Sequence, residues 1–221
     1  MPQLSGLITC WARQGEIMKC LVIILLILFS FGTIANAQTQ PQEKSLSIEQ
    51  QLAELNKNFS YRGKPIHPRA IQDLTSWVSD PLPGPIAVDV EGTFDSNRYF
   101  GKYETKENGL IFIDLKQEYL EQEGSFSYEY LGRFANGYHV LRIFYWGGGT
   151  GIFQSILLVE CVVDFEYKDD GSRRNLLVIK RRGEFGLGDR YSGEIKLEAK
   201  ENSISIGADK RNNEKPYRVK L

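Results

Sequence analysis

Residues 152–168 read IFQSILLVECVVDFEYK, which is the strongest strand signal in the chain. Apolar side chains recur at every second position on one face, as a β-strand requires. Ile156, Leu158 and Val162 make the other face partly apolar, so we expect the middle of this strand to be covered on both sides. A strand this apolar would aggregate at a sheet edge, which predicts a central position. Fully extended it measures about 50 Å, so it must bend, coil around a barrel or project from the body.

The sequence on either side of this strand predicts an antiparallel sheet. The glycine-rich segment 147–151 joins it to a second strand at 138–146, and 184–190 is predicted to be another glycine-rich turn. No helical pattern separates the strands, which excludes a parallel α/β sheet. A meander-rich barrel is favoured because closure removes sheet edges, with a sandwich as the alternative. Further strands are predicted at 86–91, 99–103, 110–115, 126–130, 175–181, 191–197, 203–206 and 217–221.

Two short helices are predicted before the strands. Within 48–57 the apolar residues have helical spacing, and Ser47 is a plausible N-cap. Within 68–78 Pro68 suits the first helical position, and the proline-rich segment 79–85 ends the pattern. The predicted fold class is therefore mainly β: a single antiparallel domain over 48–221 that begins with these one or two helices.

The N-terminus has the pattern of a secretory signal peptide. Residues 21–35 are apolar and uncharged, and Lys19 precedes them. The apolar run is shorter than the ~20 residues that span a bilayer. Ala35 and Ala37 form a small-x-small cleavage site, which predicts a mature chain beginning at Gln38.

This interpretation predicts an exported protein, secreted or periplasmic, with no stable membrane span after cleavage. A retained signal anchor is the alternative. Residues 1–37 hold two possible translation starts, Met1 and Met18, because Met18, Lys19 and the apolar run form a compact signal peptide by themselves. Residues 38–47 are polar and without periodicity, as a flexible arm would be. Cys161 is then the single cysteine of the mature chain, so no intramolecular disulfide can form.

The charge distribution gives no sign of a nucleic-acid partner. The chain has 27 Lys and Arg against 28 Asp and Glu, a formal net charge of −1. Basic residues are interleaved with acidic ones, whereas a nucleic-acid-binding protein normally shows a clustered basic surface.

Sequence motifs for catalysis are missing from this chain. It contains no G-x-S-x-G elbow, H-E-x-x-H pair or C-x-x-C pair, and the glycines at 147–151 lack the Gly-Lys-Ser/Thr of a phosphate loop. His67, His139 and Cys161 lack the spacing of a metal site, and structural roles are expected for all three. We therefore predict no catalytic residue, no metal and no cofactor.

Two groups of residues remain as candidate sites. Aromatic residues flank the glycine-rich 147–151 segment, and they define a candidate binding lip of Tyr145, Trp146, Gly148, Gly149 and Phe153. Oxygen ligands gather near one strand end, and they define a candidate polar cluster of Asp89, Glu91, Asp95 and Asn97. A solvated strand face and turn is the simpler interpretation of the polar cluster, with a cation or sugar site as the alternative.

These observations favour a noncatalytic binding or interaction module, although the partner is unknown. A secreted hydrolase that uses paired carboxylates is one alternative. An envelope structural subunit that assembles through the 138–168 hairpin is another.

Overall fold

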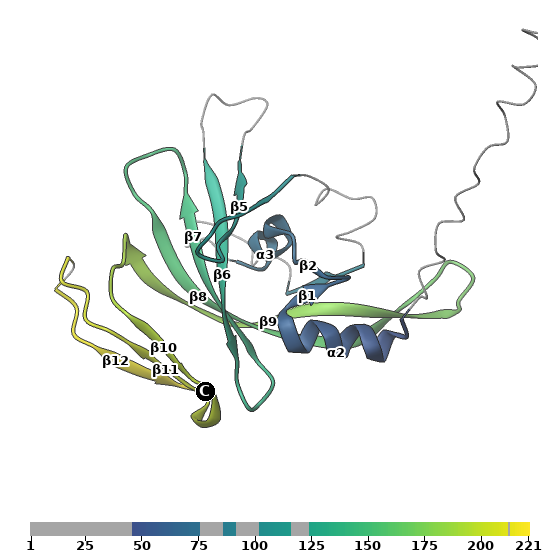
Figure 1. Ribbon diagram of the computed structural model, residues 1–221. Coiled ribbons are helices and arrows are strands. Elements are labelled where there is room, and N and C mark those ends of the chain that lie inside the picture. The colour runs from purple at the N-terminus through teal and green to yellow at the C-terminus, as the bar shows by residue number, and fades with distance from the viewer. Residues whose placement is uncertain (1–45, 76–85, 92–101, 116–123, 212) are drawn as a thin grey trace, which may run out of the picture. The chain divides into compact units, whose positions relative to one another are not determined.

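Strand β8 (Phe153–Tyr167) lies inside a seven-stranded antiparallel sheet, as its sequence predicts. This computed structural model describes residues 46–75, 86–91, 102–115, 124–211 and 213–221, which belong to one compact unit, Leu46–Leu221 (Figure 1). The sheet has the order β3-β9-β8-β7-β6-β5-β4. Its other strands are β3 (Ala87–Asp89), β4 (Glu104–Thr105), β5 (Ile111–Asp114), β6 (Ser125–Arg133), β7 (His139–Trp146) and β9 (Arg173–Asp189).

The large sheet curls into a half-barrel, which confirms the predicted mainly β, antiparallel fold class. Its end strands β3 and β4 do not pair with each other, so the described strands leave the barrel open. The 147–151 segment connects β7 to β8, and the register joins Tyr145 to Phe153 at that end. The predicted hairpin between 138–146 and 152–168 is therefore confirmed.

Strand β9 is longer than predicted, and it contains two β-bulges. The predicted turn at 184–190 is wrong, since the strand runs through this segment to Asp189. Gln154 pairs with Gly188 but Ser155 pairs with Gly186, and Leu158 pairs with Gly183 but Val159 pairs with Arg181. One residue of β9 is skipped at each of these steps, as in a bulge. The bulges let the longer strand stay in register with the shorter one.

Both faces of the middle of β8 are covered, as predicted. On the concave face Leu157, Val159 and Cys161 pack in a core with residues of the two helices. On the opposite face Ile156 and Leu158 share a second core with a three-stranded sheet. That sheet comprises β10 (Ile195–Glu198), β11 (Ser203–Ile206) and β12 (Tyr217–Lys220), with the 3₁₀ helix η1 (Ala199–Glu201) between β10 and β11.

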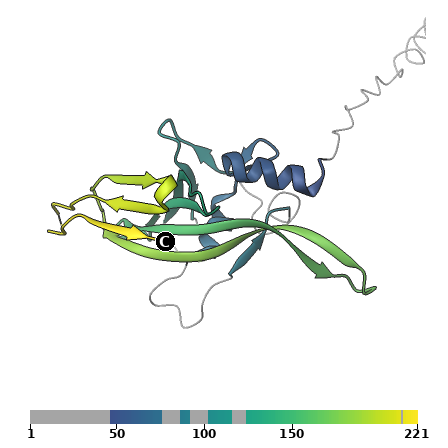
Figure 2. The ribbon, with the colours of Figure 1, turned by 90° about the horizontal axis from the view of Figure 1, so that it is seen from below.

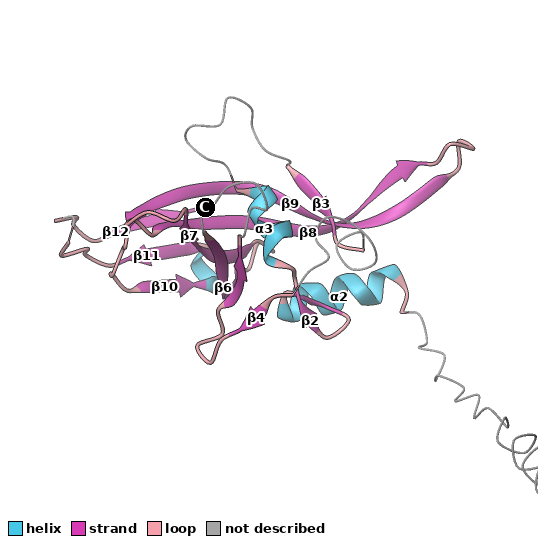
Figure 3. Cartoon of the chain, turned by 90° about the horizontal axis from the view of Figure 1, so that it is seen from above, coloured by secondary structure: helices cyan, strands magenta, loops and turns pink. Residues whose placement is uncertain are grey.

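Helix α2 (Ile48–Asn58) confirms the predicted helix at 48–57. Ser47 caps it in a capping box with Gln50, which satisfies backbone N–H groups at the helix start. The short hairpin β1 (Ser60–Tyr61) and β2 (Lys64–Pro65) links it to α3 (Pro68–Leu74). Figure 3 shows both helices in cyan beside the magenta sheet.

Helix α3 is shorter than the predicted 68–78. Thr75 has extended backbone angles, and its Oγ1 donates to the Gln72 carbonyl, which competes with helical hydrogen bonding. The predicted strand 191–197 begins only at Ile195. Of the strand predicted at 99–103, Lys102 and Tyr103 precede β4 rather than forming a strand. Residues 76–78 and 99–101 lie outside the described residues.

The predicted signal peptide, its cleavage residues Ala35, Ala37 and Gln38, and residues 38–45 of the arm lie outside the described residues. Within the described segments, no helix is both long and apolar enough to cross a membrane.

Candidate functional site

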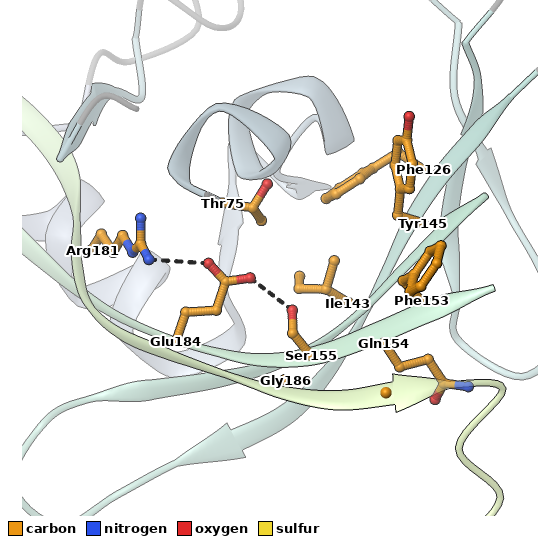
Figure 4. Close-up of a pocket in the computed structure, with 11 residues that line it drawn as sticks. Thr75, Phe126, Ile143, Tyr145, Phe153, Gln154, Ser155, Arg181, Glu184 and Gly186 are labelled. Carbon is orange, nitrogen blue, oxygen red and sulfur yellow. Dashed lines mark hydrogen bonds and ion pairs between the residues drawn. The ribbon is translucent and has the colours of Figure 1, made fainter. Parts of the chain in front are cut away.

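A pocket of about 370 Å³ opens on the concave face of the half-barrel, beside the end of α3 (Figure 4). Thr75 lines it from the helix side, and strands β6, β7, β8 and β9 supply the other lining residues. Its size lies within the range of small-molecule sites. It is therefore a candidate binding site within the described chain.

One wall of this pocket is a row of aromatic side chains that crosses three strands. Phe126 of β6 lies opposite Tyr145 of β7, and Tyr145 lies opposite Phe153 of β8. Residues directly opposite in an antiparallel sheet point to the same face, so the three rings line one side together. Ile143, two residues before Tyr145, extends the apolar wall.

The polar side of the pocket is a partly buried charge pair with a hydroxyl. Arg181 Nη2 lies 3.2 Å from Glu184 Oε2, and these side chains are 21% and 11% exposed. Ser155 Oγ donates a hydrogen bond of 2.8 Å to Glu184 Oε1. Figure 4 shows all three side chains facing the same space. We call Arg181, Glu184 and Ser155 the polar floor.

A β-bulge makes the polar floor possible. Residues three apart in a regular strand point to opposite faces, so Arg181 and Glu184 would be separated by the sheet. The register skips Arg182, because Val159 pairs with Arg181 while Leu158 pairs with Gly183. The extra residue restores a common face for the two charged side chains.

Gly186 leaves room in the pocket. It lies opposite Ser155 in the register and lines the pocket. A Cβ atom built on Gly186 would meet nothing within 4 Å, and its backbone is not in the left-handed region. A larger side chain at this position would therefore extend into the pocket without backbone strain.

The structure brings together only part of the predicted binding lip. Tyr145 and Phe153 line the pocket, whereas Trp146, Gly148 and Gly149 do not line it. Trp146 Nε1 instead donates to the Gly149 carbonyl, which ties the loop to itself, and Gly148 has a φ of +85° that suits glycine.

Sequence patterns alone did not identify the polar floor, nor Phe126, which is one of the three rings of the aromatic row. Period-two counting from Phe153 does place Ser155 on the same face, which was an available signal. No sequence signal places Arg181 and Glu184 on a common face, because a bulge is not visible in the residue pattern of a single strand.

Only half of the candidate polar cluster, Asp89 and Glu91, lies within the described part of the chain. Asp89 Oδ1 accepts a hydrogen bond of 3.0 Å from the Glu91 N–H, and Glu91 Oε2 lies 3.1 Å from Arg174 Nη2. Asp95 and Asn97 lie outside the described residues. Among the residues that are described, no three His, Cys, Asp or Glu side chains are grouped to hold a metal ion.

Cys161 and His67 both have structural surroundings. Cys161 is a buried free thiol, and burial raises its pKa to about 12, so it is not a nucleophile near neutral pH. His67 caps α3, because its Nδ1 accepts a hydrogen bond of 3.1 Å from the Arg69 N–H. These surroundings fit the structural roles expected from the sequence.

His139 is buried between two hydrogen-bond partners. Its Nε2 lies 3.0 Å from Asn56 Oδ1, and its Nδ1 lies 3.1 Å from the Tyr130 hydroxyl. Because Asn56 Oδ1 can only accept, Nε2 carries the hydrogen and Nδ1 accepts from Tyr130. Burial, together with the nearby positive charge of Arg133, lowers the pKa of His139 to about 4. The ring is therefore neutral at physiological pH.

Glu184 is the one carboxylate among the described residues that line the pocket. A glycosidase of the usual kind needs two carboxyl groups across the scissile bond. The described lining supplies one carboxyl group. Comparisons with protein-family models, with curated proteins and with solved structures find no match to this chain.

Proposed function

We propose that this chain is a noncatalytic binding protein whose concave pocket holds a small amphipathic ligand. The observation that carries the proposal is the aromatic row of Phe126, Tyr145 and Phe153 facing a pocket that also contains the polar floor. Small-molecule sites typically combine apolar walls with a few placed polar groups. An apolar body would contact the rings, and a polar head would lie at the floor.

The charge of the polar floor indicates the class of head group. Arg181 and Glu184 neutralise each other at a separation of 3.2 Å. A charged ligand that replaced one partner of this pair would leave the other partly buried without its counter-charge, which costs free energy. A neutral hydroxyl or amide can accept from the guanidinium or donate to the carboxylate while the pair persists. We therefore propose a neutral, hydroxyl- or amide-bearing apolar ligand.

Filling the pocket tests this proposal. The neutral dye N-phenyl-1-naphthylamine should bind the wild-type protein with a rise in fluorescence, because it moves from water to an apolar site. Gly186→Val should weaken this binding by at least about tenfold, since the new side chain occupies pocket space. A fluorescence titration measures both affinities.

Gly149→Val is the matched control. Gly149 also has open space around a built Cβ and no left-handed φ, but it does not line the pocket. Its variant should bind the dye like wild type. Equal affinity in the Gly186→Val variant, with its fold intact by circular dichroism, would contradict the assignment of this pocket.

In the same assay, decanol should displace the dye better than decanoate or decylamine. An equal effect of all three compounds would refute the proposal that the ligand is neutral.

We also propose that the protein acts after export, in a secreted or periplasmic location. The support is the apolar, uncharged segment 21–35 followed by the Ala35–Ala37 site. N-terminal sequencing of the exported protein should begin at Gln38. A chain retained in the membrane fraction with its leader intact would instead identify a signal anchor.

A further inference from the structure

Strands β8 and β9 continue as a two-stranded arm beyond the rest of the sheet. Pairing between β7 and β8 ends at His139 and Val159, and β3 pairs only with residues 178–180 of β9. Residues 160–167 of β8 are therefore paired on one side alone among the described strands. Figure 2 shows this arm in green, extending away from the other strands. We call the unpaired side of residues 160–167 the open edge.

One face of the arm is a series of cross-strand ion pairs. Glu160 pairs with Arg182, Asp164 lies 2.6 Å from Lys180, and Glu166 lies 3.7 Å from Arg174. Each acid belongs to β8 and each base to β9. The acidic row therefore lies on the strand that carries the open edge, and the basic row lies one strand farther away.

The other face of the arm is apolar and exposed. Val163, Phe165 and Tyr167 are 37%, 41% and 71% exposed. The rings of Phe165 and Tyr167 meet edge to face with centroids 5.6 Å apart, and the Arg173 guanidinium lies 3.7 Å from the Phe165 centroid. These contacts hold the aromatic side chains in place on a surface that is open to a partner.

An open edge with an apolar face is a site for strand addition. Unpaired backbone N–H and C=O groups provide the hydrogen bonds, and side chains on the two faces provide selectivity. We propose that the open edge adds an extended strand from a partner protein, in which apolar residues alternate with lysine or arginine. The apolar residues would continue the Val163–Tyr167 face, and the basic ones would lie beside Glu160, Asp164 and Glu166.

Charge disfavours a second copy of this chain as the added antiparallel strand. Consider two copies of residues 160–167 paired as antiparallel strands. Four registers pair at least five residues and place both polar faces on the same side of the sheet. These registers place Glu160 opposite Asp164, Glu160 opposite Glu166, Asp164 opposite itself, or Asp164 opposite Glu166. Like charges directly opposite destabilise a sheet. A strand that carries bases in these positions removes the conflict.

A designed peptide tests strand addition. The probe is an eight-residue peptide of alternating lysine and valine, with blocked ends. Added to the exported protein, it should slow hydrogen exchange of backbone amides within 160–167, because amides at the open edge become hydrogen-bonded. The same peptide with alternate amides N-methylated on its pairing side should give no protection. Equal protection by both peptides, or none by either, would overturn the proposal.

Charge variants give the second test. The triple variant Glu160→Gln, Asp164→Asn, Glu166→Gln should bind the peptide about tenfold more weakly, because three cross-strand charge contacts are lost. The matched control carries Glu104→Gln, Glu107→Gln and Asp114→Asn, which are exposed and lie outside the arm. It should bind like wild type. Equal weakening in both variants would show that the peptide is attracted only by net charge. Protection of 160–167 from hydrogen exchange in concentrated protein without peptide would identify self-pairing. Either result would refute the proposal.

Discussion

Leu157→Ala should lower the free energy of unfolding by about 3 kcal/mol, and Ile156→Ala should lower it by a similar amount. The two residues are neighbours on β8 and both are 0% exposed. Their side chains belong to different cores, Leu157 to the concave core with the helices and Ile156 to the core shared with the three-stranded sheet. Each substitution leaves a cavity in one of them. Urea unfolding followed by circular dichroism measures both effects.

Val163→Ala is the control for this prediction. Val163 lies on the same strand, but it is 37% exposed and lies on the arm. Its truncation should cost less than about 1 kcal/mol, because little buried surface is lost. If Ile156→Ala were as mild as Val163→Ala, then the three-stranded sheet would not be packed against β8 in solution. The comparison thus tests coverage of each face separately.

Acidification should destabilise the protein through His139. The ring has a pKa of about 4 in the folded state, below the ordinary value of 6.5 that it recovers on unfolding. Between these values the unfolded state binds more protons, so stability falls as the pH drops through this window. Between pH 7 and pH 4.5 the His139 contribution amounts to about 2 kcal/mol.

The measurement compares wild type with His139→Gln, which cannot titrate in this range. Carboxylates titrate in both proteins, so the difference between their unfolding free energies isolates the histidine. Wild type should lose about 2 kcal/mol more than the variant over this pH interval. Parallel pH profiles would mean that His139 can be protonated without leaving its site between Asn56 and Tyr130.

Strand patterns in the sequence predict only some of the residues that line the concave pocket. Tyr145 and Phe153 were identified as neighbours because a hairpin across 147–151 places them together. Phe126 could not be identified as their neighbour, although its strand was predicted. Its position opposite Tyr145 depends on the register between β6 and β7. Register follows from packing between strands and is not a property of either strand alone.

The sequence by itself determined the alternation of β8, its central place in an antiparallel sheet and the start of α2 at Ser47. These features follow from short-range periodicity and from a local cap, which neighbouring residues specify. Only the tertiary structure decided that β9 bulges at Arg182 and so places Arg181 beside Glu184. That bulge depends on how β9 is matched to β8 along its whole length, a long-range condition that no local pattern contains.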